Sequence, residues 1–175
     1  APTPSGPPRT FAQYYSFMAL NYIYHLLNMI AEGVFESYPN LKFVFSDGAG
    51  DMVTPFIWRM DTFGRPHLEQ TPWAPQMPSA YLPGHVHFVN GKVDGPGDQP
   101  MASEWLRMTG KEDMVMFGSS YPHWDTADHR DLPSAWTQEQ RDKVLFRNAA
   151  RLYGLESAEL APRGAAPLLT PRLPA

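Results

Sequence analysis

A buried strand that stops abruptly in a polar turn is the feature that most constrains this chain. The apolar run Met-Val-Met at 114–116 leads directly into residues 117–124, which read Phe-Gly-Ser-Ser-Tyr-Pro-His-Trp. In α/β proteins, catalytic groups collect at the carboxyl ends of parallel strands. We therefore expect the functional site at the edge of the fold where this strand ends in small polar residues, Tyr and His.

Segments with strand and helix character alternate along the chain. We predict strands at Leu41–Phe45, His85–Val89 and Met114–Gly118. The predicted helices are Phe11–Ala31, Glu32–Tyr38, Asp51–Phe63, Met101–Met108 and Thr137–Tyr153. This alternation is typical of parallel βα units. The sequence therefore predicts an α/β fold, a partial (β/α)8 TIM-type barrel that contains about the last three βα units.

Three βα units are too few to close a barrel. A complete barrel usually needs about 250 residues, whereas this chain has 175. The predicted helix 11–31 is apolar on more than one side, with large side chains at helical spacing: Phe17, Leu20, Tyr24, Leu27 and Ile30. Half a barrel does not bury several faces of one helix. We therefore expect a second chain, carrying the N-terminal half of the barrel, to complete the fold.

Local signals set the expected boundaries. Thr10 is a candidate N-cap, Thr137 with Gln140 forms a capping box, and Gly154 is a helix stop. Pro55 is compatible with its helix only in the first turn. The chain then divides into an extended Pro-rich arm at 1–9, the barrel half at 10–155 and a Pro/Ala-rich tail at 156–175.

Composition excludes several classes of function. The net charge is −4, and Lys and Arg are scattered, so we expect no nucleic-acid partner. No run of about 18 apolar residues is present, so we expect no membrane span and a soluble, cytoplasmic protein. The chain has no cysteine, which excludes disulfides, thiolate metal sites and Cys nucleophiles.

Polar and aromatic side chains follow the predicted strands and are the candidate site residues. Asp47 follows the first strand, where a partly desolvated carboxylate could act as a general base or metal ligand. It could equally cap the turn and the next helix. Asn90 follows the second strand, and we expect Asn90, Tyr121 and Trp124 to contact a small-molecule substrate.

Ser120 and His123 lie three residues apart after the last strand. A nucleophilic serine would need an orienting acid and an oxyanion hole, and no Gly-x-Ser-x-Gly elbow is present. We therefore expect Ser120 to be a polar contact and His123 to be an acid. His123 could instead donate to a substrate carboxylate or support its loop, and Asp125 and Asp128 are candidates to orient it.

The sequence His85-Val86-His87 has the spacing of a metal-binding pair on one face of a strand. Here, however, the pair stands at the beginning of its strand, away from the expected catalytic edge. We therefore assign no metal ligand within this chain.

Five segments together resemble a known family. The phrase at 117–124 is joined by Gly33-Val34-Phe35-Glu36, residues 38–45 (Tyr-Pro-Asn-Leu-Lys-Phe-Val-Phe), Trp58-Arg59-Met60-Asp61 and residues 148–154 (Asn-Ala-Ala-Arg-Leu-Tyr-Gly). The chain resembles the C-terminal half of the amidohydrolase superfamily, in the amidohydrolase-2 branch that includes aminocarboxymuconate semialdehyde decarboxylase. The resemblance covers roughly residues 8–155. Members commonly carry Asp, a metal ligand or proton carrier, where this chain has Ser120.

The resemblance implies hydrolysis or nonoxidative decarboxylation of a small carboxylated or cyclic substrate. It also implies a divalent metal, Zn or Mn, held mainly by a His-x-His strand in the half of the barrel that this sequence does not contain. A hydroxyl at Ser120 does not replace a carboxylate, because such sites rely on deprotonated donors.

Two interpretations follow from the resemblance. In the first, the chain is one subunit of a split enzyme, with Asp47, Ser120 and His123 facing the pocket as base, polar contact and acid. In the second, it is a noncatalytic scaffold or maturation subunit that kept the barrel shape and lost the metal site. Ser120 favours the second interpretation, whereas Asp47 and the segment 121–124 favour a surviving pocket.

Overall fold

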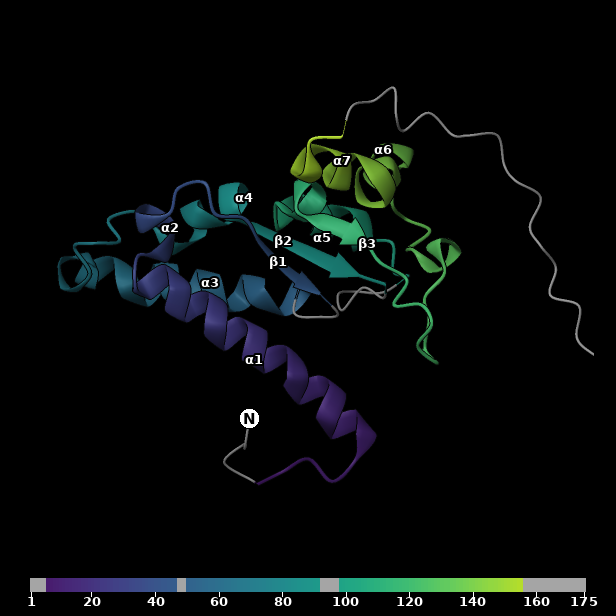
Figure 1. Cartoon of the computed structure of the whole chain (residues 1–175), viewed down its shortest axis with the longest axis horizontal. Coiled ribbons are helices and arrows are strands. Elements are labelled where there is room, and N and C mark those ends of the chain that lie inside the picture. Colours follow the sequence, from purple (N-terminus) through teal and green to yellow (C-terminus); the bar gives the residue numbers. More distant parts are fainter. Residues whose placement is uncertain (1–5, 47–49, 92–97, 156–175) are drawn as a thin grey trace, which may run out of the picture.

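A computed structural model of the chain describes residues 6–46, 50–91 and 98–155, and it contains one three-stranded parallel sheet (Figure 1). The strands β1 (Phe43–Ser46), β2 (Val86–Asn90) and β3 (Val115–Phe117) lie in the order β1-β2-β3. Each is followed by at least one helix, as the alternating sequence pattern predicted. The fold is therefore mixed α/β, with a small parallel sheet consistent with part of a TIM-like barrel.

The pairing register divides the strand residues between two faces of the sheet. Phe45 pairs with Phe88, which pairs with Val115, so these three side chains share one face. All three belong to the hydrophobic core of the described residues. The alternate positions on the opposite face do not belong to that core cluster; they are Val44, Ser46, His87, Val89 and Met116, of which only Met116 is buried. One face of the sheet is thus packed, and the other is covered less completely.

Helix α1 (Phe11–Ala31) packs against the core with a single stripe of side chains. Ala19, Ile23, Leu26 and Ile30 form that stripe, at the spacing of one helical face. Tyr24 is 75% exposed, so within the described residues this chain covers one face of the helix, and burial of its other apolar side chains by a second chain stays a prediction. The predicted Thr10 cap is confirmed as a capping box with Gln13. In Figure 1 the N-terminal half of α1 projects beyond the rest of the fold.

The helices after the strands begin close to their predicted positions. They are α3 (Gly50–Gly64) after β1, α5 (Ala102–Met108) after β2, and α6 (Gln138–Asp142) with α7 (Asn148–Tyr153) after β3; α2 (Val34–Ser37) and α4 (Leu82–His85) are short. Pro55 is the sixth residue of α3, so its expected place in the first turn is wrong. The helix begins at Gly50, so Pro55 lies in the second turn. Because proline has no backbone N–H, one main-chain hydrogen bond of that turn is missing.

The final helix is continuous but not uniform. Residues 143–147 form a π-helical turn between α6 and α7. The predicted capping box of Thr137 with Gln140 is confirmed, and Gly154 ends the helix with a φ of 64°. Within the described parts of the chain, no helix is long and apolar enough to cross a membrane.

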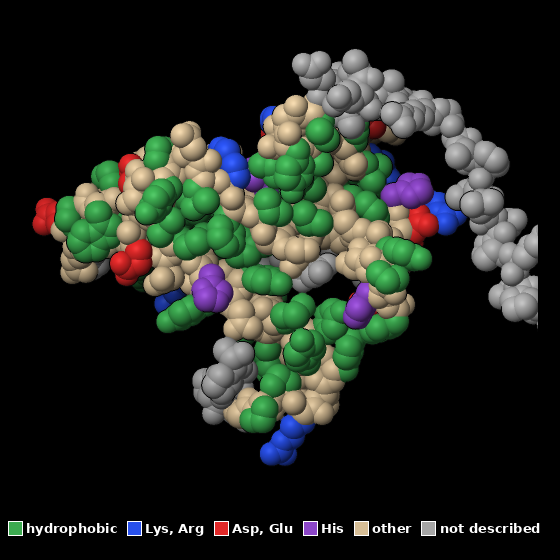
Figure 2. All heavy atoms as spheres, viewed as in Figure 1, with side chains coloured by type: hydrophobic (Ala, Val, Ile, Leu, Met, Phe, Trp, Pro, Cys, Tyr) green, Lys and Arg blue, Asp and Glu red, His purple; other side chains and the backbone are tan. Residues whose placement is uncertain are grey.

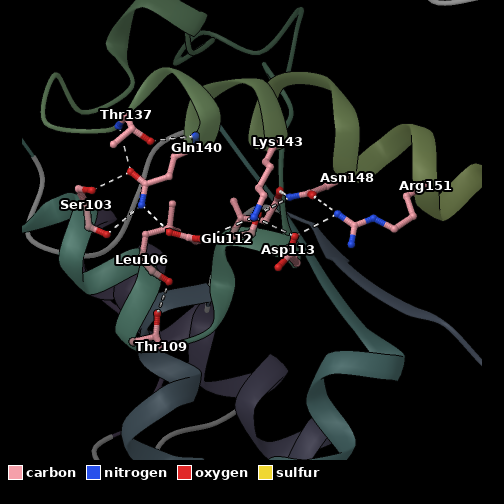
Figure 3. A network of polar contacts seen from close by, with 11 residues as sticks. Ser103, Leu106, Thr109, Glu112, Asp113, Thr137, Gln140, Lys143, Asn148 and Arg151 are labelled. Carbon is pink, nitrogen blue, oxygen red and sulfur yellow. Dashed lines mark hydrogen bonds and ion pairs between the residues drawn. The ribbon is translucent and has the colours of Figure 1, made fainter. Parts of the chain in front are cut away.

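A polar network joins the final helix to β3 and to the turn before it (Figure 3). The carboxamide nitrogen of Asn148, which is 1% exposed, donates to the carbonyls of Glu112 and Val115 at 2.7 Å each. Its oxygen accepts from Arg151 at 3.0 Å. The Val115 bond occupies a carbonyl of β3 itself, so Asn148 holds the helix in place against the strand that carries the polar turn.

Replacing Asn148 with Ala is expected to lower the free energy of unfolding by about 2–3 kcal/mol, because two main-chain carbonyls lose their donor. The matched control is Gln138→Ala, which removes an exposed bond to Asp142 and should cost less than about 0.5 kcal/mol. Urea denaturation of both variants measures the difference. Equal losses would show that the buried amide is not what secures the helix.

Candidate functional site

A cavity of about 910 Å³ lies where the strands end. It is bounded by the N-terminal half of α1, by the end of β2 and by the segment that follows β3; its lining includes Phe11, Tyr14, Tyr15, Met52, Asn90, Gly91, Ser120, Tyr121, His123, Trp124 and Asp125. Figure 2 shows the surface hollowed between α1 and the segment after β3, with hydrophobic side chains on both sides. Five of the six residues predicted from sequence therefore meet at one cavity.

Asn90 is the predicted contact that lies deepest, being 5% exposed. A Cβ on Gly50 would come within 2.8 Å of its carboxamide nitrogen, so α3 begins directly against it. A Cβ on Gly91 would come within 2.6 Å of the Gly118 carbonyl oxygen. These close approaches bring the ends of β2 and β3 together. The carboxamide oxygen of Asn90 has no hydrogen-bond partner among the described residues.

The segment after β3 folds into a tight turn that presents its side chains to the cavity. Ser120 has a φ of 58°, a left-handed conformation that is uncommon for a residue other than Gly, Asn or Asp. Its carbonyl accepts from the His123 backbone N–H at 2.8 Å. The Ser119 carbonyl accepts from the Ala127 N–H at 2.9 Å and closes the loop. Tyr121 and Trp124 remain exposed at its tip.

The Asp125 carboxylate is hydrogen-bonded both to His123 and to Tyr15 of helix α1. Nδ1 of His123 is hydrogen-bonded to Asp125, and a carboxylate can only accept, so Nδ1 carries the proton. The Tyr15 hydroxyl donates to the other Asp125 oxygen at 3.0 Å. The hydrogen bond from His123 lowers the pKa of Asp125; partial burial opposes this, and Tyr15 lowers it further. Nε2 of His123 is left to accept or give a proton.

The partner of His123 was partly predictable from the sequence. Asp125 was a candidate to orient His123, and the structure places the two in contact. Asp128, the other candidate, instead binds Arg130 at 2.6 Å and caps the turn His129–Asp131, so the expectation that it serves His123 is wrong. Tyr15 was missed because it is 110 positions from Asp125, and no local pattern links them.

The two histidines of His85-Val86-His87 do not share a strand face. His85 ends the short helix α4, where its ring stacks on Phe35 and its Nδ1 donates to the Leu41 carbonyl at 2.8 Å. The expected strand at His85–Val89 is thus wrong by one residue. His87 lies on the sheet face outside the core, and burial, helped by Lys42 and Arg151, lowers its pKa. Burial of His87 therefore favours its neutral ring.

The described residues of this chain do not form a metal site by themselves. No group of three or more His, Asp or Glu side chains placed to hold a metal occurs among them. In the cavity, Nδ1 of His123 and both oxygens of Asp125 are engaged with each other or with Tyr15. Ser120 offers a neutral hydroxyl in place of a carboxylate. Asp47, the remaining candidate, lies outside the described residues.

A family model described as amidohydrolase matches residues 21–155. This range includes all three strands and the whole turn after β3, and it leaves out the first half of α1, which carries Tyr15. Comparison with curated proteins finds no match.

Replacing Tyr15 with Phe is expected to raise the pKa of Asp125 toward its ordinary value, because the charged carboxylate loses a hydrogen-bond donor. Because the native pKa is lowered, the stabilisation from these contacts exists above the ordinary pKa and disappears as the pH falls through the native value. NMR titration of the Asp125 carboxyl carbon measures the shift. Tyr14→Phe is the matched control, and an equal shift there would contradict the assignment.

Proposed function

Because the chain belongs to the amidohydrolase family, we propose that it is one subunit of a split amidohydrolase-like enzyme. A second chain supplies the N-terminal half of the barrel. The assembly hydrolyses or nonoxidatively decarboxylates a small carboxylated or cyclic substrate in the cytosol. In this proposal the chain corresponds to the C-terminal half of a protein from the aminocarboxymuconate semialdehyde decarboxylase branch.

The incomplete covering of one sheet face is the observation that carries the proposal. One face packs under the helices, while on the other face Val44, His87 and Val89 are only partly buried and Met116 is buried. Among the described residues, β1 and β3 each have a single neighbouring strand, so the sheet has two open edges. A parallel sheet is normally covered on both faces. In a closed barrel, further strands pair with these edges and the uncovered face becomes the packed interior.

The cavity residues have distinct roles in this proposal. His123, with its Nδ1 proton held by Asp125, accepts a proton at Nε2 from an attacking water and returns it to the leaving group. The Asp125 carboxylate stabilises the imidazolium that forms between these two steps. Ser120 is a polar contact and Asp47 is a second base. Asn90, Tyr121 and Trp124 contact the substrate.

The proposed divalent metal, Zn or Mn, takes its ligands mainly from the partner half. We assign none to this chain, because its described residues contain no group of three or more candidate ligands and the Asp125 carboxylate is hydrogen-bonded to His123 and Tyr15. The chain then contributes the proton-transfer group and one wall of the pocket.

A second candidate is a noncatalytic scaffold or maturation subunit. Ser120 supports it, since a hydroxyl stands where the resembled family carries a carboxylate. The buried polar Asn90 and the carboxylate-held His123 support the enzyme, because a scaffold has no need of either arrangement.

Combining this chain with one that carries the first half of an amidohydrolase barrel, including an intact His-x-His strand, tests the proposal. We expect a stable heteromer by light scattering and slowed hydrogen exchange at β1 and β3, because both edges gain a neighbour. Turnover should require both chains and fall at least about a hundredfold in His123→Gln. If this chain is a monomer that melts cooperatively and does not bind the second chain, the split-enzyme proposal is refuted.

Replacing Ser120 with Asp is expected to raise the metal content of that assembly, because a carboxylate supplies the anionic donor that the hydroxyl lacks. The left-handed conformation at this position tolerates Asp. Ser120→Asn is the control, since it has the same shape and backbone tolerance without the charge. Metal analysis after gel filtration makes the comparison. An unchanged metal content in Ser120→Asp would indicate that the pocket no longer binds metal.

A further inference from the structure

Five aromatic side chains gather around the cavity from two distant parts of the chain. They are Phe11, Tyr14 and Tyr15 from α1 and Tyr121 and Trp124 from the turn after β3. Each is between 37% and 81% exposed, although burial of such rings would be favourable. Phe11 contacts Trp124 with ring centroids 5.5 Å apart, so the two groups meet across the cavity.

The rings are arranged as walls and not as parallel plates. Phe11 and Tyr15 are tilted by 40°, Phe11 and Trp124 by 58°, and Tyr14 and Tyr15 by 69°. A flat ring system binds best between parallel faces. Rings that face in different directions suit a rounded group that touches several of them at once, such as an alkylated ammonium.

The charge of the cavity favours a cation. Asp125 contributes a carboxylate, and no Lys or Arg occurs among the described residues that line the cavity. The negative faces of the aromatic rings add to this field. A ligand carboxylate would meet Asp125 without a Lys or Arg from these residues to pair with. A positively charged nitrogen would meet both the rings and the carboxylate.

Asn90 indicates that the ligand also carries a hydrogen-bond donor. Its carboxamide oxygen is buried and has no described partner, although it belongs to a residue that lines the cavity. A buried acceptor without a donor is costly, so a ligand hydroxyl or N–H that reaches this oxygen gains a hydrogen bond. The occupant should therefore carry both a positive nitrogen and a nearby donor.

We propose that the cavity binds a small organic cation, an alkylated ammonium with a hydroxyl or N–H donor, held by the aromatic walls, Asp125 and Asn90. The inference rests on the proposed function, because it narrows the substrate class of the same cavity. The substrate then carries its positive nitrogen against this chain, and any carboxylate it bears must face the partner half. A volume of about 910 Å³ is ample for such a molecule.

Choline and 3,3-dimethylbutan-1-ol provide a matched pair of probes, since they share a shape and a hydroxyl and differ by one positive nitrogen in place of carbon. We expect the full chain to bind choline at least roughly tenfold more tightly than the alcohol, and to bind benzoate more weakly than either. Calorimetric titration measures all three. Equal affinities for choline and the alcohol, preference for benzoate, or no saturable choline binding would each overturn the proposal.

Three variants locate the site. Trp124→Ala should weaken choline binding severalfold, since it removes an exposed ring from the wall. Asp125→Asn should weaken choline binding but leave the affinity for 3,3-dimethylbutan-1-ol unchanged. Tyr24→Ala removes an equally exposed ring of α1 that does not line the cavity and should change neither. Thermal melting verifies that each variant is folded. Loss of choline binding in Tyr24→Ala, or its full retention in both other variants, would refute the location.

The two proposals fail separately. Choline selectivity is measured on this chain alone and involves no reaction, whereas turnover needs the partner half. If selectivity is absent but the heteromer turns over a substrate, only the ligand class is wrong. If selectivity is present without turnover in any assembly, the cation site stands and the enzyme proposal is wrong.

Discussion

The parallel pairing of three short strands determines where everything else in this protein lies. Because β1, β2 and β3 run in the same direction, the residues that follow them emerge at one edge of the sheet. Asn90 and the turn that begins at Gly118 become neighbours for this reason, although they are far apart in sequence. The glycines at positions 91 and 118 let the two strand ends approach each other more closely than side chains would allow.

A second interaction converts this edge into a cavity. Tyr15 reaches from α1 to Asp125, and Phe11 contacts Trp124 nearby. These contacts place a helix wall opposite the turn after β3 and fix the carboxylate that orients His123. The group suited to proton transfer and the aromatic wall suited to ligand binding therefore depend on the same helix. A change in the position of α1 would alter both together.

The two faces of the sheet explain why a partner is a natural proposal. Phe45, Phe88 and Val115 are packed under helices, whereas Val44, His87 and Val89 on the opposite face are not part of that core. His87 illustrates the difference: it is partly desolvated, its Nδ1 has no described partner, and its pKa is lowered by that burial. Such a face is stable as the lining of a closed barrel and less favourable as a free surface.

Much of the fold was predictable because its signals are local. Apolar runs that end in polar turns indicated the strands, and the N-cap at Thr10 and the capping box at Thr137 marked the starts of two helices. The predicted boundaries were less accurate where an element begins or ends because of tertiary packing. His85 was assigned to a strand, but stacking on Phe35 and a bond to Leu41 hold it in a helical turn. The sequence also did not indicate which face of α1 meets the sheet, because large apolar side chains occur on more than one side of the helix; the structure buries Ala19, Ile23, Leu26 and Ile30.

The sequence by itself determined the order of strands and helices, the helix caps, the absence of cysteine chemistry and which polar residues follow each strand. Those properties depend on neighbours a few positions apart, so a pattern is enough to reveal them. Only the tertiary structure decided that Tyr15 meets Asp125, that Asp128 belongs to Arg130, and that five aromatic rings surround one cavity. These contacts join segments that diffuse independently in the unfolded chain, and they exist because the packed sheet brings those segments together.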